Sequence, residues 1–293
     1  MLVEVHAAGV TYPDLLLAWG KYQARPDLPF VLGTQFAGRV AWAPASSAFA
    51  VGQRVGGFSL TGGFAEWVAC DEANLLVLPD GCSWQSAAAS LTNYLTAHFL
   101  LVERAGVRSG ERVLIHGAGG GLGLAAVQVA RCLGADVLAV TSSDAKSAAA
   151  HASGATTLLP ADGFAEWAAA GAGAGSVDVV VDPVGGDRFT DSVRCLAPGG
   201  RLIVAGFASG SIPTVAVNRL LLRNVAVIGG AWGPWARVHP GFVQRQWQQL
   251  TTWFTTRQLR PVVSEVLPLH DVAHALGLLD DRKSVGNVVL RIR

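Results

Sequence analysis

A glycine-rich turn near the middle of the chain is the segment best suited to hold a charged group. Apolar residues 113–115 lead into residues 117–123, whose sequence is GAGGGLG, and an alanine-rich apolar stretch follows. A strand that turns directly into a helix leaves the first helical N–H groups unpaired, at the positive end of the helix dipole. Glycine also lets an anion approach the backbone closely. The pattern predicts a pyrophosphate site, with contacts from Gly120, Gly121, Leu122 and Gly123.

The spacing of this turn departs from the G-x-G-x-x-G pattern of dinucleotide sites. The spacing is Ala118-x-Gly120-Gly121-x-Gly123, so Ala118 stands in place of the first glycine of that pattern. An ordinary turn between a strand and a helix is the alternative. The regular alternation of strands and helices around the turn favours the dinucleotide site.

Residues after the next predicted strand, 136–141, bear on which dinucleotide would bind. Sheets that prefer NAD place Asp or Glu there to accept hydrogen bonds from the ribose hydroxyls. Here the strand is followed by Ser142 and Ser143, with Lys146 close behind. Small hydroxyls leave room for a 2′-phosphate, and a lysine supplies the compensating charge. The sequence therefore predicts NADPH over NADH, although Asp144 would oppose a phosphate, and Lys146 on a solvated helix face is the alternative.

The elements that position these residues alternate regularly between about residues 95 and 230. The spacing predicts a parallel, doubly wound sheet covered by helices on both faces. The predicted strands are 113–116, 136–141, 156–159, 177–181, 201–205 and 225–228. The predicted helices begin at Gly121 and cover 144–152, 164–170, 189–196 and 218–223, with a loop at 168–175 and a Pro-Gly-Gly turn at 198–200.

The two ends of the chain have a different pattern. Residues 1–94 contain short strands cut by Gly and Pro, which is typical of a β-barrel. Residues 241–256 favour a helix, and a further strand, helix and strand follow it. We therefore expect an α/β protein with two domains. Residues 95–257 would form a Rossmann domain that binds a dinucleotide, and residues 1–94 with 258–293 a second, mostly β domain.

Composition excludes several classes of function. The net charge of +1 and a charged fraction of 15% provide no basic surface for nucleic acid. Every apolar run is interrupted before 18 residues, and the N-terminus lacks the features of a secretory signal. Four cysteines and seven histidines lack the spacing of metal ligands, so no metal site is predicted. We expect a cytoplasmic protein.

Short motifs in a fixed order over nearly the whole chain resemble a known family. They include AAGVTYPD at 7–14, GGFAE at 62–66, LPDG at 78–81, VDPVGG at 181–186, PGGR at 198–201 and GFASG at 206–210. The chain resembles the zinc-free quinone oxidoreductase branch of the medium-chain dehydrogenase/reductase superfamily, the zeta-crystallin-like proteins. The resemblance implies a GroES-like catalytic domain beside the Rossmann domain. Family members begin with two or more further strands, so the catalytic domain is expected to be incomplete at its N-terminus.

The resemblance also implies site residues. Tyr22 matches a tyrosine that lines the active site, and Thr11 stands where relatives commonly carry an Asn near the nicotinamide. Further residues match positions along the bound dinucleotide: Thr96, Gly206, Phe207, Asn218 and Gly229. For Tyr22 and Thr96, packing within the protein is the alternative.

The expected function is transfer of hydride from NADPH to a quinone or an α,β-unsaturated carbonyl, because such acceptors are electron-poor and need no metal. The alternative is a relative that binds the dinucleotide with little or no turnover. Relatives often dimerise through the last strand of the Rossmann sheet, so residues 225–230 predict a homodimer. No nucleic acid is expected as a partner.

Overall fold

The computed structural model describes residues 1–166 and 176–293. Part of the helix predicted over 164–170 and all of the loop predicted over 168–175 fall outside these residues. The contacts divide the described chain into two compact units. Unit 1 contains residues 1–93, 247–255 and 260–293, and unit 2 contains residues 94–246 and 256–259. The chain passes between the units at four points, one inside α2 (Trp84–His98), one inside α9 (Phe242–Thr255) and two in the residues after α9.

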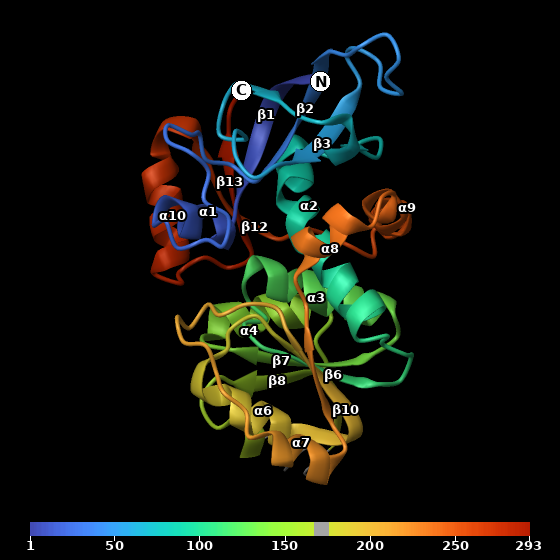
Figure 1. Cartoon of the computed structure of the whole chain (residues 1–293), viewed down its shortest axis with the longest axis vertical. Helices are drawn as coiled ribbons and strands as arrows, with labels where there is room; N and C mark the ends of the chain where they lie inside the picture. Colours follow the sequence, from blue (N-terminus) through green and yellow to red (C-terminus); the bar gives the residue numbers. More distant parts are fainter. Residues whose placement is uncertain (167–175) are drawn as a thin grey trace. The chain divides into compact units, whose positions relative to one another are not determined.

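Unit 2 is built on a parallel sheet of six strands in the order β11-β10-β9-β6-β7-β8 (Figure 1). The strands are β6 (Arg112–Ile115), β7 (Asp136–Thr141), β8 (Thr157–Pro160), β9 (Val177–Asp182), β10 (Leu196–Val204) and β11 (Ala226–Gly229). The strand order reverses between β6 and β9, which is where doubly wound sheets bind ligands. The structure confirms the predicted Rossmann-type sheet.

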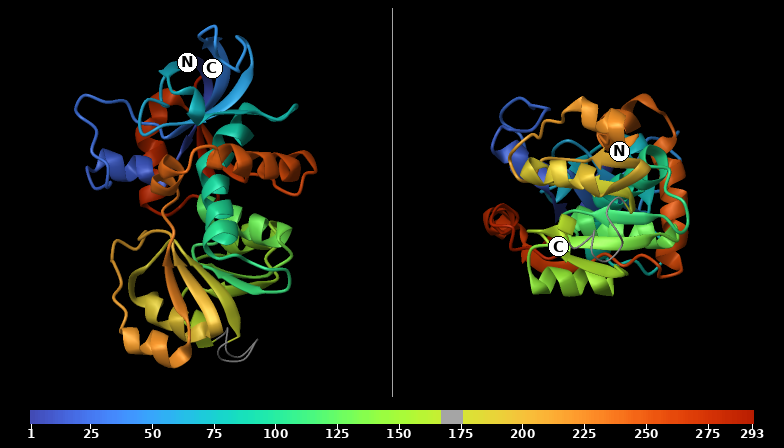
Figure 2. Two further views of the ribbon diagram at one scale, coloured as in Figure 1. Left: turned by 45° about the vertical axis from the view of Figure 1, so that its right-hand side comes forward. Right: turned by 90° about the horizontal axis from the view of Figure 1, so that it is seen from below.

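Helices cover both faces of this sheet. The helices α3 (Gly121–Cys132) and α4 (Asp144–Ala152) lie on one face, and α6 (Phe189–Cys195) and α7 (Val217–Arg223) on the other (Figures 1 and 2). The apolar residues of the central strands are consequently buried on both sides, as for Val113, Leu114 and Ile115. Other helical pieces of the unit are η2 (Phe99–Arg104), η3 (Gly186–Arg188) and α8 (Trp232–Val238).

One predicted turn is wrong. Residues 198–200, Pro-Gly-Gly, lie within strand β10 rather than before it. The pairing of β10 with β9 is irregular there, because its register shifts between Leu196 and Arg201. Gly199 adopts a φ of +80°, so the strand bends through this sequence without ending.

Unit 1 is built on a mixed sheet, whose main order is β12-β13-β1-β2-β3-β5 while β4 pairs with β1. Among its described strands, only β12 and β13 run parallel. The strands are β1 (Leu2–Val10), β2 (Gln35–Trp42), β3 (Arg54–Phe58), β4 (Trp67–Ala69), β5 (Leu75–Val77), β12 (Val263–Pro268) and β13 (Asn287–Arg291). Strand β1 lies between β13 and β2 and carries Val3, Val5 and Ala8 into the core. Residues from both ends of the chain therefore share one sheet.

Two helices of unit 1 were not predicted from the sequence: α1 (Tyr12–Ala18) and α2. Helix α1 packs on α10 (Val272–Asp280), and the unit also contains η1 (Glu72–Asn74) and η4 (Leu269–Asp271). Within the described residues, no helix is both long and apolar enough to span a membrane.

Candidate functional site

The glycine-rich turn lies at the carboxyl end of β6, in the centre of the unit 2 sheet. Gly117 takes a φ of +59°, and the Ala118 N–H donates to the Val140 carbonyl at 3.1 Å, which fixes the turn against β7. Gly120 is extended, with φ −90° and ψ 176°, and no side chain caps the helix that begins at Gly121. The first N–H groups of α3 therefore face away from the helix without a capping side chain, as anion binding requires.

Two glycines of the turn differ in what surrounds them. A Cβ at Gly123 would stand 2.1 Å from the Gly117 carbonyl oxygen, so glycine is required there for α3 to pack on the turn. A Cβ at Gly120 would meet only that same oxygen, at 3.6 Å, which is ordinary contact. The protein therefore leaves space for a Cβ at Gly120.

Lys146 lies directly against the turn. A Cβ at Gly119 would stand 2.3 Å from Lys146 Cβ and 2.5 Å from Cγ, so the lysine stem packs on the glycine backbone. Ser143 is the N-cap of α4, and its hydroxyl accepts from the Lys146 N–H at 3.4 Å. Ser142 and Ser143 are exposed. The structure thus brings the predicted 2′-phosphate residues to the predicted pyrophosphate turn.

Two further loops reach the same edge of the sheet. The Ala208 N–H donates to the Pro183 carbonyl at 3.1 Å, and the Ser209 N–H to the Val184 carbonyl at 2.9 Å. A Cβ at Gly117 would lie 3.2 Å from Val184 Cγ2, which places this loop pair beside the glycine turn. The paired loops carry the predicted residues Gly206 and Phe207, and the Phe207 ring is partly exposed.

The other dinucleotide residues predicted by resemblance lie farther along the fold. Gly229 ends β11 opposite Val204, so it belongs to the carboxyl edge of the sheet, and its carbonyl accepts from Arg104 Nε at 2.9 Å. Asn218 is exposed in the first turn of α7, and Thr96 is half-buried in α2.

Asp182 and His116 are buried under this edge. Asp182 Oδ1 accepts from the N–H groups of Val184 and Gly185, both at 2.9 Å, and so forms the turn after β9. His116 Nε2 lies 2.8 Å from Ser192 Oγ, whose own hydrogen goes to the Arg188 carbonyl at 2.9 Å. The proton of this imidazole must therefore be on Nε2, which donates to Ser192. Burial lowers the pKa of His116 to about 4, with Asp182 opposing that shift.

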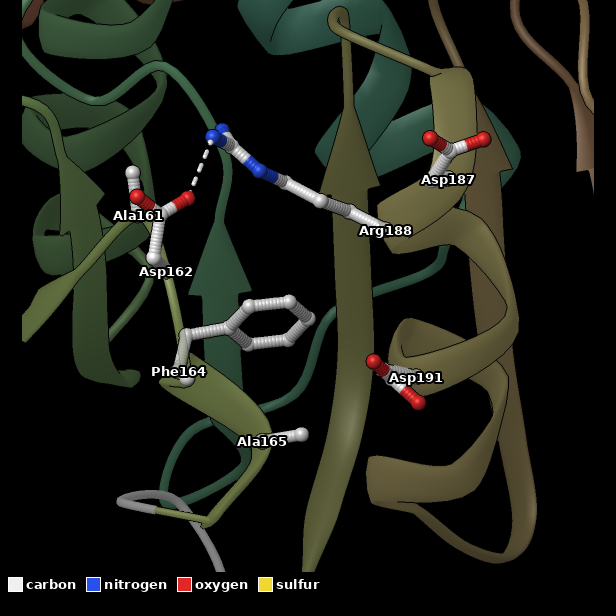
Figure 3. Close-up of a pocket in the computed structure, with 8 residues that line it drawn as sticks. Ala161, Asp162, Phe164, Ala165, Asp187, Arg188 and Asp191 are labelled. Atoms are coloured by element: carbon white, nitrogen blue, oxygen red, sulfur yellow. Dashed lines mark hydrogen bonds and ion pairs between the residues drawn. The ribbon is translucent and has the colours of Figure 1, made fainter.

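A pocket of about 210 Å³ opens beyond β8, next to η3 and α6 (Figure 3). Arg188 reaches across the pocket above the ring of Phe164, and its Nη2 lies 3.3 Å from Asp162 Oδ1. Asp187 and Asp191 also line the pocket, so its carboxylates outnumber its single guanidinium. Such a lining disfavours a phosphate, and none of the predicted site residues lies in it.

In unit 1, Thr11 is the N-cap of α1 and is buried beside Asp14. Asp14 Oδ2 accepts from the Thr11 N–H at 2.8 Å and lies 2.6 Å from Thr11 Oγ1. The Thr34 N–H donates to Oδ1 at 2.9 Å, and the Thr34 hydroxyl lies 3.2 Å from Oδ2 and 2.8 Å from the Thr11 hydroxyl. Sequence reasoning missed Asp14 and Thr34, although Thr-x-x-Asp before an apolar run is a recognisable capping pattern.

Tyr22 lies beyond the other end of α1. Its N–H donates to the Leu16 carbonyl at 3.2 Å, and its side chain is half-buried. At 1.5 Å per residue, the seven residues of α1 separate the two ends by about 10 Å. The two predicted catalytic residues thus stand at opposite ends of one short helix.

Comparisons with protein families agree with the folds of unit 1 and unit 2. The family described as alcohol dehydrogenase GroES-like domain matches residues 1–80, and zinc-binding dehydrogenase matches residues 121–255. Quinone oxidoreductase-like protein 2 of Bos taurus is 37% identical over 99% of this chain and 84% of its own length. The chain belongs to the medium-chain dehydrogenase/reductase superfamily. This confirms the resemblance found in the sequence.

Solved structures of the superfamily are similar throughout. The quinone oxidoreductase of Thermus thermophilus, solved also as its complex with NADPH, is 36% identical with a TM-score of 0.85. The match covers 99% of this chain and 90% of that one. The quinone oxidoreductase of Escherichia coli complexed with NADPH is 26% identical with a TM-score of 0.91, over 99% of this chain and 91% of the other.

Zinc is the metal that one of the matching families implies. In the part of the chain that the structure describes, no three His, Cys, Asp or Glu side chains gather closely enough to hold a metal ion. The four cysteines Cys70, Cys82, Cys132 and Cys195 are free thiols, and burial raises the pKa of each, which disfavours the thiolate that zinc binds. The donors present do not fit zinc.

Proposed function

We propose that this oxidoreductase reduces a quinone or an α,β-unsaturated carbonyl with NADPH. The observation that carries the proposal is the packing of Lys146 on the glycine turn, with space for a Cβ at Gly120. This arrangement puts a cation beside unpaired helical N–H groups, which suits a dinucleotide with an additional 2′-phosphate. The NADPH complexes of the Thermus thermophilus and Escherichia coli quinone oxidoreductases support it.

In this proposal, the chain binds NADPH along the carboxyl edge of the unit 2 sheet. The N–H groups at the start of α3 hold the diphosphate, and the 2′-phosphate lies between Lys146 and the hydroxyls of Ser142 and Ser143. When bound, NADPH supplies the hydride. The remaining contacts rest on the family resemblance: Thr96, Gly206, Phe207, Asn218 and Gly229.

Unit 1 supplies the groups proposed to face the acceptor. Tyr22 and Thr11 carry hydroxyls, which can donate a hydrogen bond to the oxygen of a quinone or enone and polarise it. An electron-poor acceptor suits a donor set without metal ligands, because its conjugated oxygen stabilises the negative charge that hydride addition creates.

An anaerobic screen tests this function. We expect NADPH oxidation, followed at 340 nm, with naphthoquinone, benzoquinone and simple enones, and little oxidation with simple alcohol–aldehyde pairs. Calorimetry with NADPH measures binding separately. Quenching of tryptophan fluorescence by NADPH without its consumption would indicate instead a dinucleotide-binding protein with little or no turnover. Absence of any heat of binding would reject both.

A cytoplasmic location and a homodimer remain predictions. Fractionation of cells that make the protein measures the first, and light scattering measures the second.

A further inference from the structure

Asp14 is a carboxyl group enclosed by two threonines inside unit 1. It is 0% exposed, whereas Thr11 and Thr34 retain 6% and 8% of their surface. Both threonine N–H groups donate to its carboxyl oxygens, and both threonine hydroxyls lie within hydrogen-bond distance of Oδ2. The two threonine hydroxyls are therefore the groups beside Oδ2 that can exchange a proton with it.

The hydrogen-bond distances allow two arrangements of protons. When Asp14 is ionised, the Thr11 hydroxyl donates to Oδ2 across 2.6 Å. When Asp14 is protonated, Oδ2 donates to Thr11 Oγ1 across the same distance, and the Thr11 hydrogen becomes free to point elsewhere. The Thr11 hydroxyl thus changes from donor to acceptor as the carboxyl group gains its proton.

Burial raises the pKa of Asp14 to about 6, against the lowering effect of the four hydrogen bonds from Thr11 and Thr34. Burial is the largest cause of this shift, and the hydrogen bonds from Thr11 and Thr34 oppose it. A carboxyl group with such a pKa carries its proton in about half of the molecules at pH 6 and in about a tenth at pH 7, far more than an exposed aspartate does.

We propose that Asp14 is the proton reservoir for reduction of the acceptor, with the Thr11 hydroxyl as the relay. The inference rests on the proposed function, which places Thr11 beside the acceptor. Asp14 itself touches no substrate, so it acts through Thr11 as a positioning residue. Thr34 donates hydrogen bonds from its N–H and its hydroxyl to the carboxylate that Asp14 becomes when it loses its proton.

Atoms and electrons balance in this step. Hydride from NADPH adds two electrons and one hydrogen to the acceptor and leaves an enolate or hydroquinone monoanion. The Thr11 O–H bond breaks, and its proton forms a new O–H bond on the acceptor oxygen. Simultaneously the Asp14 O–H bond breaks, and its proton restores the Thr11 hydroxyl. The Asp14 carboxylate then has four donors, namely the N–H and hydroxyl groups of Thr11 and Thr34. Water returns the proton after the product leaves.

Substitution of Thr11 tests the relay. In Thr11→Val, we expect kcat to fall about a hundredfold or more, the range of a lost proton transfer, with the NADPH dissociation constant unchanged. Thr11→Ser keeps a hydroxyl and should restore most of the turnover. Thr34→Val should lower kcat less, because it removes only one donor to the carboxylate. Equal kcat in Thr11→Val and the wild type would overturn the proposal.

The pH profile distinguishes a relay from a structural role. In the wild type, kcat should decline above about pH 6, as Asp14 loses its proton. In Thr11→Val this decline should disappear, together with the solvent deuterium isotope effect on kcat. A decline and an isotope effect that persist unchanged in Thr11→Val would also overturn the relay.

The chain offers a matched control in unit 2. The Thr156 hydroxyl donates to the carboxylate of Asp136 at the amino end of β7, away from the carboxyl edge that would bind the dinucleotide. Thr156→Val removes a hydrogen bond of the same type, from a threonine hydroxyl to an aspartate, at an exposed position. Its kcat, pH profile and isotope effect should match those of the wild type.

A titration without substrate separates this proposal from the proposed function. The 13C carboxyl resonance of Asp14, assigned by its loss in Asp14→Asn, should titrate with a midpoint near pH 6 in the unliganded protein. A midpoint below about pH 4, the ordinary range of aspartate, would overturn the reservoir whether or not the protein oxidises NADPH. Failure of the proposed function would appear instead as a wild type that oxidises no NADPH with any acceptor.

Discussion

The stem of Lys146 covers the backbone of Gly119, so that a side chain at residue 119 would stand only 2.3 Å from Lys146 Cβ. Two contacts hold the start of α4 next to β7. Ser143 caps the helix, and the hydroxyl of Thr141, the last residue of β7, lies 2.5 Å from Ser147 Oγ. The group proposed to bind the 2′-phosphate is therefore fixed to the loop proposed to bind the diphosphate. In this proposal, one structural feature both selects NADPH and binds its diphosphate.

Lys146→Ala should raise the Michaelis constant for NADPH several-fold and leave that for NADH unchanged, because only NADPH carries the 2′-phosphate. Lys283→Ala provides a matched control, since Lys283 is an exposed lysine that pairs with Asp281 in unit 1. Steady-state kinetics with both dinucleotides measure the effect. Equal changes for NADPH and NADH would reject the assignment of Lys146.

Gly120→Ala should weaken NADPH binding and leave stability nearly unchanged, whereas Gly123→Ala should lower stability. A Cβ at Gly120 meets nothing closer than 3.6 Å, so Gly120→Ala should change the free energy of unfolding by less than about 0.5 kcal/mol. It should nevertheless weaken NADPH binding at least about tenfold, since the methyl group occupies the proposed phosphate position, a loss of about 1.4 kcal/mol.

Gly123→Ala places a methyl group 2.1 Å from the Gly117 carbonyl oxygen. It should therefore destabilise the fold by at least about 1–3 kcal/mol, as overpacking does. Chemical denaturation and calorimetry measure both variants. Normal NADPH affinity in Gly120→Ala would show that the diphosphate binds elsewhere.

The Rossmann sheet was largely predictable from the sequence, because its signals are local. The predicted strand 136–141 and helix 144–152 coincide with β7 and α4. Continuous β-branched runs mark buried parallel strands, and Ser143 marks a helix start. The turn predicted at 198–200 was wrong because an irregular strand register accommodates Gly199, which only the pairing with β9 can specify.

The candidate site was less predictable, because its contacts join residues far apart in sequence. The packing of Lys146 on Gly119 depends on the separation of α4 from the glycine turn, which neither segment encodes alone. Thr34 hydrogen-bonds to Asp14 although the two are 20 residues apart in sequence, and no local sequence pattern predicts that pair. The roles of Tyr22, Thr96 and Asn218 rest on family resemblance and stay predictions.

His116 should make the stability of the fold sensitive to acid. Burial lowers its pKa from 6.5 to about 4, so between these values the unfolded chain binds a proton that the folded chain excludes. The contribution of the neutral imidazole is complete above pH 6.5 and is lost as the pH falls towards 4. A shift of this size corresponds to about 3 kcal/mol.

His116→Gln removes the titration and keeps a side-chain amide that can donate to Ser192 Oγ. Urea denaturation between pH 4.5 and 7.5 should show a steeper loss of the free energy of unfolding in the wild type than in this variant. Other titrating groups affect both proteins alike and cancel in the difference. Parallel pH dependences would contradict the buried neutral state of His116.

The outer edge of β11 and the neighbouring helix α7 predict a homodimer. Strand β11 is last in the order of the described strands of its sheet, so its outer backbone groups have no strand partner there. Leu221 and Leu222 of α7 are 76% and 77% exposed, which is unusual for adjacent large apolar residues. Pairing of two β11 strands around a twofold axis would satisfy the edge and would bring these leucines towards the partner.

We therefore expect light scattering to give the mass of a dimer. The double variant Leu221→Lys and Leu222→Lys should dissociate into monomers, since four added charges would face one another in the dimer. The glycine turn lies three strands away in the sheet order, so the NADPH dissociation constant of the monomer should stay that of the wild type. A wild type that is monomeric at all concentrations would exclude this interface. A double variant that remains dimeric would place the contact on another surface.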